Sequence, residues 1–159
     1  YFQWGRYSDG HEKSKDEKIS NNVINTLRAN HNLPILNFNQ SGNWTFADTT
    51  NAWKGMESIN NPCPIGFRIP TSNEIRSEKL NDPFLSFLKI PASGFKIIDD
   101  RSNTVEFLEN VYNFWSSDIC GKEDNYSTLL PCIYTLNKNL EIIHSGYPTD
   151  LIPVRCIKD

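Results

Sequence analysis

Long apolar runs and basic runs are both missing from this chain of 159 residues. Its apolar stretches span only a few residues, as at Ile97-Ile98 or Leu129-Leu130, too short for a membrane span or a signal-peptide core. No run of Lys or Arg exceeds two residues and the net charge is −3, so the basic stripe that neutralises nucleic-acid phosphates is lacking. We therefore expect no nucleic-acid partner and no membrane span in this chain.

An initiating Met is lacking too, because the chain opens at Tyr1. We interpret the chain as a single domain from a longer exported protein. Only 38% of its residues are hydrophobic, but 12% are aromatic, and large rings build a core from few positions. Asn is the commonest residue, and nine Pro and eight Gly accompany it. This composition predicts a loop-rich α+β domain with short strands and little helix.

Cysteine is present in an even number, and three pairings of the four residues are open. No two are spaced as C-x-x-C and the three His are scattered, which disfavours a structural zinc site. We favour two disulfides, and hence an extracytoplasmic location, over four reduced thiols in the cytosol. The residues concerned are Cys63, Cys120, Cys132 and Cys156, and His11, His31 and His144.

One helix has a clear start signal. Thr71 with Glu74 three residues later forms a capping box, which predicts a helix from this point to about Leu80. Apolar spacing between Asp16 and Asn30 fits a second short helix, but the Asn residues within it fit a loop equally well.

Strands are expected in the second half of the chain. Residues 95–98 predict a short strand, followed by a polar turn over 99–103. Residues 132–136 and 140–144 alternate around an Asn-Lys-Asn turn, which predicts a hairpin. Residues 152–157 predict a terminal strand that contains Cys156.

Five separate motifs occur in one order along nearly the whole chain. They are Tyr1-Phe2-Gln3-Trp4-Gly5-Arg6 with Asp9-Gly10-His11, Cys63-Pro64-Ile65-Gly66-Phe67-Arg68-Ile69-Pro70-Thr71, Ile90-Pro91-Ala92-Ser93-Gly94-Phe95, Phe114-Trp115-Ser116-Ser117 and Val154-Arg155-Cys156-Ile157-Lys158-Asp159. Together they resemble the bacterial Fibrobacter succinogenes major paralogous domain family, whose elements include C-P-x-G-[WF]-R-[VIL]-P-T and V-R-C-[VI]-K-D. The run from Arg68 to Ile75 is also similar to the R-L-P-T-x-x-E-W run of formylglycine-generating enzymes.

The resemblance implies a C-type-lectin-like fold, in which an early helix is tied to the last strand. It further implies that Cys63 pairs with Cys156 and Cys120 with Cys132, although the family usually has a single bridge. For other motif residues we favour structural roles over ligand contact. Gly66 should permit a turn and Arg68 should pair with a carboxylate or carbonyl, while Trp115 and Trp4 should be packed.

The sequence lacks the motifs of several kinds of chemistry. The E-P-N, Q-P-D and W-N-D triplets of calcium-dependent lectins are absent, and we interpret Asp118, Glu123, Asp124 and Asn125 as a solvated acidic loop rather than a calcium site. The three His lack a neighbouring nucleophile motif, so we expect them at the surface and predict no catalytic residue. Two glycosylation sequons, at Asn43 and Asn125, fit a chance occurrence.

These observations predict a non-catalytic binding or adhesion module of a secreted or surface protein, with a protein or glycan ligand and no cofactor. Ligand contacts are expected in long irregular loops, between about 99 and 126. The predicted contacts are Asp99, Asp100, Arg101, Asn103, Glu123, Asp124, Asn125 and Tyr126. The alternative is a structural tip or assembly domain of a surface appendage or fibre. A third, less favoured hypothesis is an oxidase like the formylglycine-generating enzymes.

Overall fold

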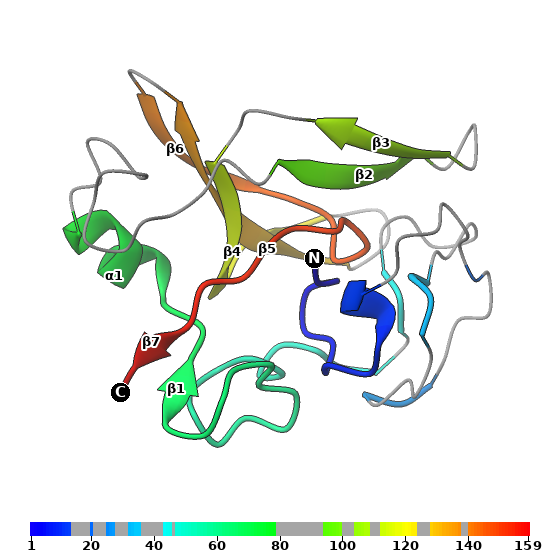
Figure 1. The fold of residues 1–159 in the computed structure, drawn as a ribbon, viewed down its shortest axis with the longest axis horizontal. Coiled ribbons are helices and arrows are strands. Elements are labelled where there is room, and N and C mark those ends of the chain that lie inside the picture. The colour runs from blue at the N-terminus through cyan, green and yellow to red at the C-terminus, as the bar shows by residue number, and fades with distance from the viewer. Residues whose placement is uncertain are drawn as a thin grey trace.

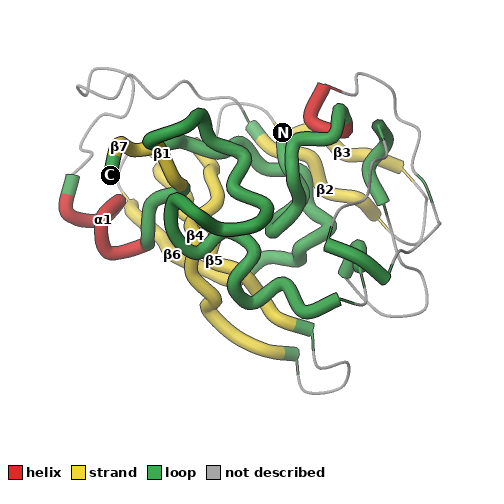
Figure 2. The backbone as a smooth tube through the Cα atoms, turned by 90° about the horizontal axis from the view of Figure 1, so that it is seen from below, coloured by secondary structure: helices red, strands yellow, loops and turns green. Residues whose placement is uncertain are grey.

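The described residues form three small antiparallel sheets, one short α-helix and connecting loops (Figures 1 and 2). A computed structural model describes residues 1–13, 20, 25–27, 32–35, 43–45, 47–78, 94–99, 104–108, 112–123, 128–137 and 140–159. Loops make up most of the described backbone outside the sheets, as the composition predicts (Figure 2).

The largest sheet has the order β4-β5-β6, formed by Tyr112–Lys122, Leu129–Asn137 and Leu140–Ser145. Asn137 pairs with Leu140, so the predicted hairpin is confirmed. Side chains on the two faces of this sheet enter different clusters, as the two-residue period of a strand requires. Phe114 and Tyr134 stack on the side of α1, whereas Trp115 and Ile133 enter the main core.

A second sheet pairs β2 (Phe95–Asp99) with β3 (Thr104–Leu108), which confirms the first of the predicted strands. The expectation that 99–126 is mainly irregular loop is wrong, because β3 and β4 occupy much of it. Their alternation of apolar and polar residues is short, so it is a weak signal until the pairing partner is known.

The third sheet is the two-residue pair of β1 (Phe67–Arg68) and β7 (Ile157–Lys158). The predicted terminal strand over 152–157 is wrong in its bounds, since Cys156 lies just before β7 and Ile152 forms an isolated bridge to Phe2. Residues 148–153 instead bond to three neighbours. Trp4 N–H donates to Pro148, Trp115 N–H donates to Pro153, and Lys96 exchanges two bonds with Leu151.

Helix α1 (Ser72–Ser77) begins where the capping box predicts. Thr71 accepts from the Glu74 N–H, and the Glu74 side chain accepts from the Thr71 N–H at 2.8 Å. The helix ends at Ser77 rather than near Leu80, and its last turn is tight because the Glu78 N–H donates to Ile75. The described residues also include a single 3-10 turn, η1 (His11–Lys13). The undecided segment 16–30 lies mostly outside the described residues.

The four tryptophans tie separate segments together. All are buried, and each indole N–H donates to a main-chain carbonyl, so none is left unsatisfied. The pairs are Trp4 to Ser116, Trp44 to Trp4, Trp53 to Arg6 and Trp115 to Phe2. Both tryptophans for which a packed role was predicted, Trp4 and Trp115, belong to the main core cluster. No helix among the described residues is long and apolar enough to cross a membrane.

Candidate ligand-binding cleft

A covalent clamp holds the segment before α1 against the C-terminal segment. Cys63 is bonded to Cys156 at a sequence separation of 93, as the resemblance implied. Next to this bridge β1 pairs with β7, and the Asp159 N–H donates to Gly66. Gly66 closes the turn with a φ of +83°, a backbone conformation that side chains with a Cβ rarely adopt. This confirms the role predicted for Gly66.

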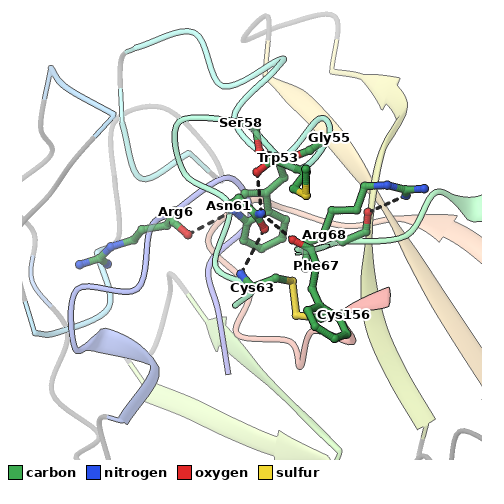
Figure 3. The surroundings of a disulfide bond; sticks show 11 residues. Arg6, Trp53, Gly55, Ser58, Asn61, Cys63, Phe67, Arg68 and Cys156 are labelled. Atoms are coloured by element: carbon green, nitrogen blue, oxygen red, sulfur yellow. Dashed lines mark hydrogen bonds between the residues drawn. A yellow bond between two sulfur atoms is a disulfide. The ribbon is translucent and has the colours of Figure 1, made fainter. Parts of the chain in front are cut away.

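Asn61 links the clamp to the loop over 49–61 (Figure 3). Its side-chain amide donates to Met56 at 2.9 Å and to Phe67 at 2.8 Å, and its carbonyl accepts from the Cys63 N–H at 3.1 Å. One side chain therefore bridges the loop, β1 and the disulfide. On the other side of this loop, Trp53 donates to the Arg6 carbonyl (Figure 3).

Arg68 is held by two carboxylates. Its guanidinium makes a two-pronged contact with Glu74, at 2.6 and 2.9 Å, and its Nε donates to Asp159 at 2.7 Å. The hydrogen bonds from Arg68 lower the pKa of Glu74 to about 2, and those to Glu74 and Asp159 raise the pKa of Arg68. This pairing was predicted, and it joins β1, α1 and the C-terminus.

Asp118 is fixed by the start of α1. Its Oδ2 accepts from the Ser72 N–H at 2.6 Å, and its own N–H donates to Ser116 Oγ at 3.1 Å. Ser116 Oγ also lies 2.9 Å from Ser72 Oγ. The carboxylate that the sequence placed in a solvated acidic loop therefore lies on β4, beside the helix.

These segments enclose a half-open cleft of about 400 Å³. One wall is the loop that Asn61 positions, the second is β1 with the start of α1, and the third is β4. The lining residues are Thr50, Lys54, Gly55, Arg68, Thr71, Glu74, Ser117, Asp118 and Ile119. The volume lies within the range of small-molecule sites. Apart from Ile119 the lining is polar or glycine, so orientation of a ligand would depend on hydrogen bonds.

A second polar cluster lies under the N-terminal segment, and all its polar groups are used internally. The Gln3 side chain donates to Ile35 and Thr149 and accepts from Arg6 at 2.6 Å. Arg6, fully buried, also donates to Asp9 at 2.9 and 3.1 Å. Removing a partner from such a network would leave a buried charge unpaired.

His11 belongs to this cluster and is buried, so the expectation that all His lie at the surface is wrong for it. The Gln3 N–H donates to Nε2 at 3.2 Å, which leaves Nδ1 to carry the proton that is shared with Asp9 at 2.6 Å. Burial lowers the pKa of His11, although the bond to Asp9 partly opposes this. For Asp9, burial raises the pKa but the bond from His11 and the charge of Arg6 outweigh it. His144 is exposed, and His31 lies outside the described residues.

Asp9, His11 and Glu12 offer three ligand atoms within 4.8 Å of one another. Both ring nitrogens of His11 already take part in hydrogen bonds, and a metal ion would have to displace one of them. We therefore interpret this group as a structural network, which leaves the cleft as the candidate site.

Two of the contacts predicted from sequence are among the described residues, and neither lines the cleft. Asp99 ends β2 and Glu123 follows β4, where its N–H donates to Thr128 at 2.9 Å. Asp100, Arg101, Asn103, Asp124, Asn125 and Tyr126 lie outside the described residues. Of the 99–126 region, Ser117, Asp118 and Ile119 line the cleft. Lys54 and Thr50 were missed, since nothing in their local sequence distinguishes them from ordinary turn residues.

The second disulfide joins Cys120 of β4 to Cys132 of β5, as the resemblance implied. It lies beside the irregular stretch of the β4–β5 pairing, between Ile119 and Gly121. The bridge therefore fixes the strand that carries Asp118 and Ile119 at a point where regular pairing is interrupted.

No family model matches the chain, and comparison with curated proteins and with solved structures found no similar sequence or fold.

Proposed function

We propose that this chain is a non-catalytic extracellular binding module, and that its ligand occupies the cleft lined by Lys54, Arg68 and Asp118. The observation that carries the proposal is the construction of the cleft. Three separate segments of the chain meet there, and each is fixed by a disulfide or by a partly buried hydrogen bond. A site whose walls are held before the ligand arrives loses less entropy on binding.

The lectin-like assignment and membership of the Fibrobacter succinogenes major paralogous domain family are part of this proposal. They are supported by the motif order in the sequence and by the bridge from the segment before α1 to the C-terminal segment. The pairing of Phe2 with Ile152 also brings the N-terminal segment beside the C-terminal one, as that fold requires.

An extracytoplasmic location is supported by the two disulfides, which are rare in reducing compartments. A role without catalysis is supported by the lining of the cleft. It holds neither His nor thiol, and its Arg68 and Glu74 are engaged with each other. The usual pairing of a nucleophile with a nearby base is therefore missing from the described lining.

The test is a binding screen of the purified, oxidised domain against glycans, peptides and small polar molecules, with calcium and with chelator. Lys54→Ala should weaken any genuine cleft ligand by roughly 10-fold or more, the usual loss for one charge-assisted hydrogen bond. Lys13→Ala, which removes an exposed Lys far from the lining, is the matched control. Ligands that both variants bind as well as wild type would place recognition outside the cleft.

A domain that binds none of these probes but is required for assembly of a surface appendage would favour the structural alternative. Retained binding in Lys54→Ala, combined with loss on alanine substitution of Asp99 or Glu123, would favour the loop contacts predicted from sequence.

A further inference from the structure

The charges of the cleft limit what it can bind. Its lining carries two positive groups, Lys54 and Arg68, and two negative groups, Glu74 and Asp118. A cleft with a balanced charge gives no net attraction to an anion such as a phosphate or to a simple cation. Discrimination must therefore come from where each charge lies.

Two of the four charges are not available. Both carboxylate oxygens of Glu74 accept hydrogen bonds from Arg68. The N–H and the hydroxyl of Thr71 also donate to this carboxylate. Arg68 is held on its other side by Asp159. A ligand that competed for either group would have to break several charge-assisted hydrogen bonds, which are stronger than bonds between neutral groups.

The other two charges remain available to a ligand. Within the described part of the chain, the Lys54 ammonium has no ion-pair or hydrogen-bond partner. Asp118 uses one oxygen for the Ser72 N–H, and its second oxygen accepts nothing from the described residues. The bond to Ser72 holds the carboxylate in place, so its open oxygen is oriented in advance.

The rest of the lining excludes other ligand classes. Ser117 Oγ donates to Pro70, which leaves its lone pairs to accept. Thr50 likewise donates to Asp48. No aromatic ring lines the cleft among the described residues, so no flat apolar face is available for a sugar ring or an aromatic ligand. Among the described lining residues, Ile119 alone has a large apolar side chain.

We propose that the cleft binds a small zwitterion, with the ligand carboxylate at Lys54 and the ligand ammonium at Asp118. This rests on the proposed function and names the ligand class of that site. A free α-amino acid and a short peptide with open termini share this chemistry, and the cleft volume of about 400 Å³ is sufficient for either.

The experiment is calorimetry of the intact, oxidised domain with three sets of probes. The first set is free amino acids, the second is di- and tripeptides with open termini, and the third is the same compounds with the amine acetylated or the carboxylate amidated. A neutral polyol of similar size is added as a further probe. Amino acids and peptides differ in the separation of their charges, so the tighter set identifies the source.

The variants are Asp118→Asn and Lys54→Gln. The Asn carbonyl can still accept from the Ser72 N–H, so Asp118→Asn removes the charge without removing that bond. We expect each variant, and each single block on the ligand, to weaken binding roughly 10- to 100-fold. Acetylation of the ligand amine should reduce the affinity of Asp118→Asn almost no further, because this variant already lacks the charged partner of that amine. Lys13→Ala should bind like wild type.

Three other outcomes overturn the inference. If acetylation and Asp118→Asn weaken binding independently, the ammonium does not lie at Asp118. If the neutral polyol binds at the cleft and the charge variants are without effect, the zwitterion class is wrong while the binding function stands. If no probe binds and the variants also leave every ligand from the broader screen unaffected, the cleft is not the site and both proposals fall.

Discussion

Removing the clamp between Cys63 and Cys156 should destabilise the domain more than removing the other disulfide. The change is Cys63→Ala with Cys156→Ala, compared with Cys120→Ala with Cys132→Ala as the matched control. The first bridge closes a loop of 93 residues and the second one of 12. Chain-entropy arithmetic assigns them about 4.6 and about 2.8 kcal/mol of stability, because a longer loop restricts the unfolded chain more.

Each pair of substitutions also removes sulfur contacts. Cys63 packs against the main core cluster in the first pair, while in the second pair Cys132 is buried and Cys120 is exposed. The main difference between the two pairs is loop length. Against a typical total of about 5–15 kcal/mol, the first variant should be near the limit of stable folding. Clamp removal should also abolish ligand binding, because β1 and the start of α1 form one wall of the cleft.

The assay is urea denaturation of oxidised wild type and both variants, followed by tryptophan fluorescence. The expected result is a free energy of unfolding lower by about 2 kcal/mol in the clamp variant than in the control variant. Failure of the clamp variant to fold, while the control variant folds, agrees with the same reasoning. Equal losses, or a larger loss in the control variant, would refute it.

Three other predictions concern single residues. Burial raises the pKa of Asp150 from 3.8 to about 7, so the stability that is present at low pH is lost as the pH rises to 7. In urea titrations, Asp150→Asn should therefore raise the free energy of unfolding by about 1–3 kcal/mol at pH 8 and leave it unchanged at pH 3.5. In that Asp150→Asn background, stability should fall as the pH drops below 6.5, because burial lowers the pKa of His11; a rise over the same range, measured in the same way, would contradict the buried neutral imidazole. Gly146→Ala should lower the free energy of unfolding by about 1–3 kcal/mol in thermal or urea unfolding, because its Cβ would overlap the Ile133 side chain. Gly121→Ala, whose Cβ would meet only Leu130 at 3.8 Å, should leave the stability almost unchanged, and similar losses in both variants would argue against the packing described.

Local signals in the sequence predicted local structure well. The capping box set the first residue of α1, and the Asn-Lys-Asn turn set the hairpin of β5 and β6. Both depend on residues a few positions apart, where backbone geometry leaves few options. The predicted bounds of the terminal strand were wrong because Ile152 and Cys156 have strand-like neighbours in sequence, whereas the pairing of this segment is decided by Phe2 and β1.

The candidate site was less predictable. Motif resemblance identified Arg68 as a pairing residue, but Lys54 enters the cleft only because Asn61 fixes its loop against β1. Likewise His11 carries no sequence mark of burial. It is enclosed by Phe2 and by the Gln3 amide, which the fold brings over it. Such contacts depend on the packing of whole segments, and hydrophobic pattern alone does not specify them.

If the ligand binds between the Lys54 loop, β1 and β4, the backbone amides of that cleft should respond to it. In a labelled domain titrated with a ligand from the screen, we expect the largest amide shifts at Gly55, Ser117 and Ile119, and we expect these shifts to be lost in Lys54→Gln. Shifts confined to residues 99–103 and 123–126, with the cleft amides unmoved, would contradict it.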